Sequence, residues 1–170
     1  MRATLARRRV PIGFASAALA YWLARPTVSS LMWGAAVALV GEAVRLWASG
    51  HIEKGREVTR SGPYRFMRHP LYVGSAIMGA GFALAALTIG SAVVVAAYLT
   101  VTLFAAIRTE EAVLDARFGP EYAAYREGRA LRADRPFSAR RALVTNREHR
   151  ALGGLLAGLA LLWVRMQFGS

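Results

Sequence analysis

The sequence predicts an all-α fold: a single domain, residues 1–170, built as a polytopic membrane bundle of about five transmembrane helices. Three observations predict it. Of the 170 residues, 55% are hydrophobic and the mean hydropathy is +0.33, which is more apolar than an ordinary soluble domain of this size. The apolar residues come in blocks, and residues 71–107 contain no charge. The basic residues gather in the segments between these blocks.

The apolar blocks define the individual spans. A membrane-crossing helix needs about 20 residues, so residues 71–107 are too long for one span and divide at the Thr-Ile-Gly-Ser sequence of residues 88–91. For the first span a cleaved signal peptide is an alternative, and for the last an interfacial or re-entrant helix. The five expected spans are residues 10–24, 27–47, 71–89, 90–107 and 151–166.

The distribution of basic residues predicts the orientation. Nineteen of the 22 Lys and Arg precede the first span, lie between the second and third, or follow the fourth. Only Arg25 and Arg165 fall on the other side, with Arg45 inside the second span. By the positive-inside rule, the N-terminus and both large loops face the cytoplasm. We therefore expect an integral membrane protein, in the inner membrane if the source is bacterial, whose basic surface meets the lipid bilayer and not nucleic acid.

Two kinds of chemistry are excluded by composition and spacing. The chain has no cysteine, so disulfides, thiolate nucleophiles and Cys-based metal sites are ruled out. His51, His69 and His149 do not show the spacing of metal ligands. We expect no metal.

Polar residues flank the long apolar block on both sides. A helical hairpin returns to the face from which it started, so Arg68, His69 and Tyr72 at its entrance should meet Glu110 and Glu111 at its exit. The first group offers hydrogen-bond donors for a carboxylate and an aromatic face for a cation. A carboxylate at a membrane surface needs a cationic partner. Since adjacent helical residues point about 100° apart, at most one glutamate can aim straight into a shared pocket.

Proline and glycine shape the helices around this hairpin. Pro70 suits the first turn of the third span, where its missing N–H costs nothing. Gly74, Gly79 and Gly81 follow it, either for tight helix packing or for close approach of a ligand. The Phe-Gly-Pro sequence of residues 118–120 is expected to end the fourth helix, after which Tyr122 and Tyr125 share one face of a further amphipathic segment.

Two further polar groups are weaker candidates. Glu42 and Arg45 stand three residues apart near the end of the second span, where they can neutralise one another. Residues 146–150, just before the last span, are polar enough to roof a cytoplasmic pocket, although their charges could equally be solvated.

The two polar flanks resemble a known pair of motifs. The Gly-Pro-Tyr of residues 62–64 followed by Arg-His-Pro-Leu-Tyr-Val-Gly at 68–74 and then Gly81 resembles the first signature of the isoprenylcysteine carboxyl methyltransferase and phospholipid methyltransferase superfamily. Arg-Thr-Glu-Glu at 108–111, followed by residues 118–122 and Tyr125, resembles the second. The resemblance covers residues 45–125.

The resemblance implies a membrane-embedded enzyme that uses S-adenosylmethionine, lacks the soluble Rossmann-type methyltransferase fold, and has its cofactor pocket at the cytoplasmic face. It implies that Glu110 or Glu111 meets the ammonium of the cofactor and that Arg68 orients an acceptor carboxylate or phosphate. Arg68 and Glu111 are the implied catalytic residues. The residues implied in cofactor binding are Tyr64, His69, Pro70, Tyr72, Gly74, Gly81, Glu110 and Glu111.

The acceptor is less well defined by the sequence. The resemblance favours O-methylation of an isoprenylcysteine-type carboxylate on a prenylated or other lipophilic substrate, with N-, O- or S-methylation of a phospholipid or other small lipid as the alternative. Residues 126–136 depart from the pattern expected after the second tyrosine, so the acceptor stays open. From other classes, a sterol-reductase-like enzyme using NADPH and a non-catalytic small membrane protein are the competing hypotheses. The oligomeric state is not predicted.

Overall fold

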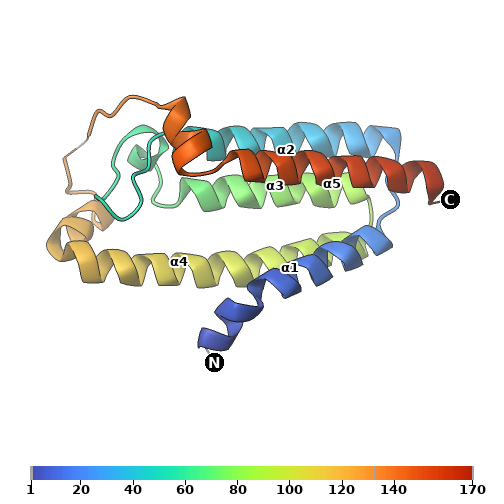
Figure 1. The fold of residues 1–170 in the computed structure, drawn as a ribbon, viewed down its shortest axis with the longest axis horizontal. Helices are drawn as coiled ribbons and strands as arrows, with labels where there is room; N and C mark the ends of the chain where they lie inside the picture. Colours follow the sequence, from blue (N-terminus) through green and yellow to red (C-terminus); the bar gives the residue numbers. More distant parts are fainter. Residues whose placement is uncertain (1, 132, 170) are drawn as a thin grey trace.

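The computed structural model describes residues 2–131 and 133–169, with side chains from residue 11 onward. The predicted all-helical fold is confirmed, and each expected span corresponds to one α-helix (Figure 1). Two short helices lie between the long ones: η1, a 3₁₀ helix (Gly62–Arg65), and η2, a π-type turn (Arg141–Thr145). The five α-helices are α1 (Arg2–Leu23), α2 (Val28–Ser49), α3 (Pro70–Ala86), α4 (Ile89–Arg126) and α5 (His149–Phe168).

Three of these helices, α2, α4 and α5, are long and apolar enough to cross a membrane. The apolar part of α1 (Pro11–Leu23) and α3 are shorter. Large apolar side chains such as Met32, Trp33 and Phe104 point outward from the bundle, where hydrocarbon can cover them. The length, composition and outward faces of these helices indicate an integral membrane protein.

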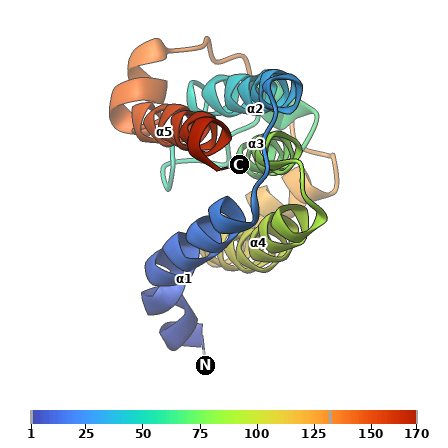
Figure 2. The same ribbon diagram turned by 90° about the vertical axis from the view of Figure 1, so that its right-hand side faces the viewer.

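Small residues bring α2 and α3 into close contact. A Cβ atom added to Gly34 would lie 2.5 Å from the carbonyl oxygen of Gly81, and one added to Gly41 would lie 2.6 Å from that of Gly74. The packing interpretation of Gly74 and Gly81 is thus confirmed. Viewed along the bundle, α2, α3 and α5 lie together on one side, and α1 lies beside α4 on the other (Figure 2).

The turn between α3 and α4 lies at the predicted place. Leu87 adopts the left-handed conformation (φ 57°) that ends α3, and the Thr88 side chain caps α4 by accepting a hydrogen bond from the Ser91 amide at 3.2 Å. The hydroxyls of Thr88 and Ser91 also donate to carbonyls of α1, those of Leu23 and Ala20. The turn therefore fixes α1 as well as the hairpin.

Helix α4 is longer than a membrane requires and bends at Gly119. Its charge-free part ends before Arg108, so the remaining residues extend toward the loops at one end of the bundle (Figure 1). Gly119 has φ 42° and ψ −112°, a conformation that favours glycine, and Pro120 follows it. The predicted interruption at residues 118–120 is confirmed, although the helix resumes at once.

The segment that leads from α4 back to α5 is bound to the loop before α3. Arg135 Nη2 lies 2.6 Å from Glu57 Oε2, Arg141 donates to the carbonyl of Gly50 at 2.7 Å, and Arg65 pairs with Asp134. These contacts hold both loops at the same end of the bundle, on the left in Figure 1.

Candidate functional site

The two polar flanks of the hairpin meet at this end of the bundle. His69 immediately precedes α3, whose first residue is Pro70, and the His69 Nε2 atom lies 3.0 Å from Glu111 Oε1 on α4. Arg68 Nη1 lies 3.2 Å from the same oxygen. The predicted convergence of the two flanks is confirmed.

The charge of Glu111 is stabilised by these neighbours. Glu111 lies beyond the charge-free part of α4, and the hydrogen bond from His69, with the nearby Arg68 guanidinium, holds the pKa of its carboxyl below the usual range. Glu111 is therefore an anion whose first role is to join the two flanks.

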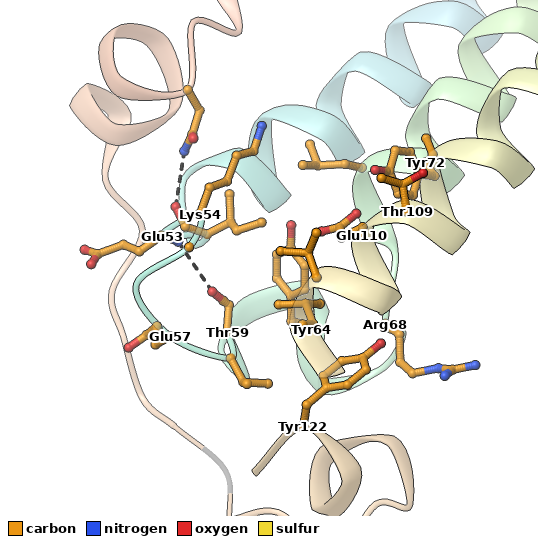
Figure 3. Close-up of a pocket in the computed structure, with 18 of the residues that line it drawn as sticks. Glu53, Lys54, Glu57, Thr59, Tyr64, Arg68, Tyr72, Thr109, Glu110 and Tyr122 are labelled. Carbon is orange, nitrogen blue, oxygen red and sulfur yellow. Dashed lines mark hydrogen bonds between the residues drawn. The ribbon is translucent and has the colours of Figure 1, made fainter. Parts of the chain in front are cut away.

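A cavity of about 710 Å³, here called the polar cavity, opens beside this junction (Figure 3). Its wall comes from the end of α2, the loop before α3, the first turn of α3, the outer half of α4 and the start of α5. Of the nine residues implied in catalysis or cofactor binding, four line it: Tyr64, Arg68, Tyr72 and Glu110. His69, Pro70, Gly74, Gly81 and Glu111 lie outside its lining.

Glu110 and Glu111 have different surroundings, as their helical offset predicts. Glu111 pairs with Arg68 and His69, whereas Glu110 lines the polar cavity and makes no ion pair with any residue that the structure describes. Figure 3 shows Glu110 and Tyr64 pointing into the same space. Glu110 is thus the member of the pair available to a ligand.

Buried tyrosine hydroxyls complete this part of the wall. Tyr64 is 6% exposed and Tyr122 is 1% exposed, and within the described residues neither hydroxyl has a hydrogen-bond partner. Burial raises the pKa of the Tyr64 hydroxyl well above its usual value, so it remains a neutral donor. Tyr125 donates to the Tyr64 carbonyl at 2.8 Å and fixes its backbone. A buried hydroxyl without a partner is costly, so a ligand that accepts from it gains affinity.

Pro70 and the glycines support the site from the side of α2. Gly74 packs on the Arg45 side chain, and Gly81 packs on Ala38. These contacts hold α3, the helix that carries Tyr72, close to α2. The ring of Tyr72 lies 5.8 Å from that of His69.

Sequence reasoning missed the main partner of Arg45. The Glu42 contact exists but is long, at 3.7 Å, whereas Arg45 Nη2 lies 2.5 Å from Oε1 of Glu148, a buried residue just before α5. Arg45 and Glu148 both line the polar cavity. Because Glu42 already offered Arg45 a partner within the same span, no signal in the sequence pointed to Glu148.

Residues 146–150 lie at the polar cavity, in keeping with the first of the two interpretations of this segment. Asn146 donates to the carbonyls of Ser49 at 2.8 Å and Ile52 at 3.2 Å, tying this segment to the end of α2. Asn146, Arg147, Glu148 and Arg150 all line the polar cavity. A neighbouring part of the wall, which was not predicted, comes from the loop residues Glu53, Lys54, Glu57 and Thr59.

Comparisons with known proteins identify the family. Two curated relatives are the cobalt-zinc-cadmium resistance protein CzcN of Cupriavidus metallidurans, 37% identical over 110 residues, and the nickel-cobalt-cadmium resistance protein NccN of Alcaligenes xylosoxydans xylosoxydans, 32% identical over 106 residues. Each alignment covers 61% of this chain, and 47% and 48% of the respective relatives. The chain thus spans about half the length of the curated relatives it matches.

No solved structure matches the chain. The family model for phospholipid methyltransferases matches residues 13–121, more than half of the chain and the region that contains both motifs. The chain therefore belongs to the phospholipid methyltransferase family, within the superfamily of membrane methyltransferases that the two motifs resemble.

Proposed function

We propose that the chain is an S-adenosylmethionine-dependent methyltransferase, that the polar cavity holds the cofactor, and that the methyl acceptor is lipophilic. The observation that carries this proposal is the composition of the cavity wall. Residues of both motifs line it, among them Glu110, a carboxylate without an ion pair in the described chain, and Tyr64, whose buried hydroxyl has no described partner. Membership of a methyltransferase family supports the same reaction.

The residues of the cavity suit this cofactor, which carries a carboxylate, an ammonium, a sulfonium and an adenine ring. Glu110 offers an anion for the positive groups, and the tyrosine rings offer aromatic faces. Cations of the wall, such as Lys54 and Arg147, suit the carboxylate. A volume of about 710 Å³ falls within the range of roughly 300–1,000 Å³ in which proteins bind small ligands.

The remaining implicated residues would act by positioning. Pro70, Gly74 and Gly81 would fix α3 against α2 and so place Tyr72. His69 and Glu111 would hold Arg68 at the cavity edge, where its guanidinium could orient the carboxylate or phosphate of an acceptor.

The reaction places modest chemical demands on the protein. When bound, the cofactor would supply a methyl group on a positively charged sulfur. The chain would hold the acceptor in line with that group and exclude water, with no covalent intermediate on the enzyme. Our first candidate acceptor is an isoprenylcysteine-type carboxylate, which arrives deprotonated. A phospholipid amine or a phenolic lipid is the alternative and would need a proton acceptor, for which Glu110 is suited.

The proposed setting is a membrane in which all five α-helices span or nearly span the bilayer. The basic loops at the polar-cavity end would face the cytoplasm, because only two basic residues, Arg25 and Arg165, fall at the opposite end of the predicted spans. The acceptor would then enter from the bilayer while the cofactor arrives from the cytoplasm. The same orientation would place the site at the inner membrane of a bacterial cell.

The names of the relatives suggest a second possibility, metal handling. Among the described residues, no group of three or more His, Asp or Glu side chains could hold a metal ion. The cavity chemistry therefore favours methyl transfer over metal binding as our proposal.

A binding titration of the purified protein with S-adenosylmethionine, S-adenosylhomocysteine and NADPH tests this function. We expect both sulfur ligands to bind and NADPH not to bind. Preferential binding of NADPH would favour a reductase, and binding of none of the three would favour a non-catalytic membrane protein.

The Glu110 assignment has a matched comparison within the chain. Glu110→Gln should weaken S-adenosylmethionine binding by about 1.5–3 kcal/mol, the usual worth of a contact to a charged group. Glu127→Gln, at an exposed position outside the cavity lining, is the control and should bind as the parent does. Equal affinity of both variants for S-adenosylmethionine would remove Glu110 from the cofactor site.

A further inference from the structure

A second cavity, of about 540 Å³, lies deeper in the bundle than the polar cavity. It is bounded by α1 and α4 on one side and by α3 and α5 on the other, and we call it the apolar cavity. Its wall consists mainly of small and aliphatic residues. Two of its few hydroxyl groups, those of Ser75 and Thr102, donate to carbonyls of their own helices, Leu71 and Tyr98, and so are already satisfied. Such a wall suits hydrocarbon.

The two cavities adjoin one another. On each of three helices the lining passes from the polar to the apolar cavity within three residues, a rise of about 4.5 Å. The residue pairs are Tyr72 and Ser75 on α3, Ala106 and Leu103 on α4, and Ala151 and Gly154 on α5. At the junction, Arg45 of the polar cavity donates to the hydroxyl of Ser75 at 2.5 Å. A molecule with a polar head and an apolar chain would fit across this junction.

Packed side chains line the end of the apolar cavity that lies away from the polar cavity. Tyr21, Phe82 and Leu162 line that end and belong to the same hydrophobic cluster as Ala24 and Ala85. The Phe82 ring packs against α5, since a Cβ atom added to Gly158 would lie 2.7 Å from its Cε1 atom. From Ser75 to Ala86, the lining of α3 extends about 16 Å along the bundle. The cavity therefore has a definite length.

We propose that the apolar cavity binds one hydrocarbon chain of the methyl acceptor and that Tyr21, Phe82 and Leu162 limit the length of chain it accepts. The proposal rests on the proposed function for the identity of the ligand as acceptor. It adds that acceptors are selected by chain length as well as by headgroup, because a chain that is too long would hold its head away from the polar cavity. Misplacement of a reacting group by about 1 Å can cost on the order of a hundredfold in rate.

Two adjacent glycines of α5 provide a matched pair of variants. Gly154 lines the apolar cavity and Gly153 does not, and a Cβ atom added at either position meets no other atom within 4 Å. Gly154→Phe should fill the cavity, while Gly153→Phe adds the same bulk on the same helix without lining it. Phe82→Ala should lengthen the cavity.

The test uses the full chain in lipid nanodiscs with a homologous series of straight-chain primary alcohols, each carrying a photoreactive diazirine at its methyl end. Labelled peptides are identified by mass spectrometry, and untagged alcohol of equal length serves as competitor. We expect saturable labelling of α3 and α5 up to a limiting chain length. We expect a loss of about tenfold in Gly154→Phe, full labelling in Gly153→Phe, and a longer limit in Phe82→Ala.

Equal labelling of the two glycine variants, or labelling that does not depend on chain length, would overturn the proposal. Affinity for S-adenosylhomocysteine is measured on the same samples. Length-limited labelling without cofactor binding would support the hydrocarbon site and reject the proposed function. Cofactor binding with labelling that does not depend on chain length would support the proposed function and reject the hydrocarbon site.

Discussion

His69 and Glu111 are joined across 42 residues of sequence, with Nε2 of the histidine 3.0 Å from Oε1 of the glutamate. The same oxygen also contacts Arg68 at 3.2 Å. One carboxylate oxygen thus closes the helical hairpin by meeting two groups of the first motif. Glu111 is engaged in this way, and its neighbour Glu110 is the member of the adjacent pair that lines the polar cavity.

Arg68 gives the first prediction. It lines the polar cavity, and its contact with Glu111 involves one nitrogen of its guanidinium group, Nη1. If its guanidinium orients the acceptor, Arg68→Ala should lower the rate of methyl transfer by on the order of a hundredfold while leaving affinity for S-adenosylhomocysteine nearly intact. Arg68→Lys should be almost as slow, since a point charge does not reproduce the planar fork.

The measurement pairs S-adenosylhomocysteine binding with turnover on prenylcysteine, phosphatidylethanolamine and phenolic-lipid acceptors. Loss of cofactor binding in Arg68→Ala would assign Arg68 to the cofactor site instead.

Sequence reasoning located the helices and the convergence of the two motifs because both follow from local signals. The uncharged block of residues 71–107 and the turn residues Thr88 and Gly119 define helix ends without any tertiary information. The partner of Arg45 could not be predicted in the same way. Glu148 lies far along the chain, and only the packing of α5 against α2 brings it to 2.5 Å from the arginine.

The ion pair between the half-buried Arg45 and the buried Glu148 gives a second prediction. Arg45→Met leaves the buried carboxylates of Glu42 and Glu148 without their shared cation and should lower the free energy of unfolding by on the order of 3–5 kcal/mol, whereas Glu148→Gln leaves Arg45 its contact with Glu42 and should lower it by less. In the double variant Arg45→Met with Glu148→Gln, part of the loss caused by Arg45→Met should be recovered, because only Glu42 then remains without a cation.

Chemical denaturation in detergent micelles, arranged as a double-mutant cycle, checks this coupling. Strictly additive losses of unfolding free energy would mean that the two residues act independently.

Membrane orientation can be tested with cysteines, since the chain contains none of its own. A cysteine at a buried position such as Ser61 would label poorly on either side of the membrane, so exposed positions are required. Arg56→Cys and Arg140→Cys, both at the polar-cavity end, should be protected in intact cells from an impermeant thiol reagent, and Arg25→Cys at the opposite end should react. The reverse labelling pattern would invert the proposed topology.

The last prediction concerns the hydroxyl of Tyr64, which is buried in the wall of the polar cavity and has no hydrogen-bond partner among the described residues. Leaving such a group unsatisfied costs about 1–3 kcal/mol, so Tyr64→Phe should raise the stability of the ligand-free protein. If the hydroxyl donates to the cofactor, the same change should weaken S-adenosylmethionine binding by about 0.5–1.5 kcal/mol. Ser61→Ala also removes a buried hydroxyl without a described partner, at a position outside the cavity lining, and serves as the comparison. Thermal unfolding with and without S-adenosylhomocysteine separates the two effects, because a binding role appears only as a smaller ligand-induced shift. A Tyr64→Phe variant that is stabilised by the ligand as strongly as the parent would show that the hydroxyl does not contact the cofactor.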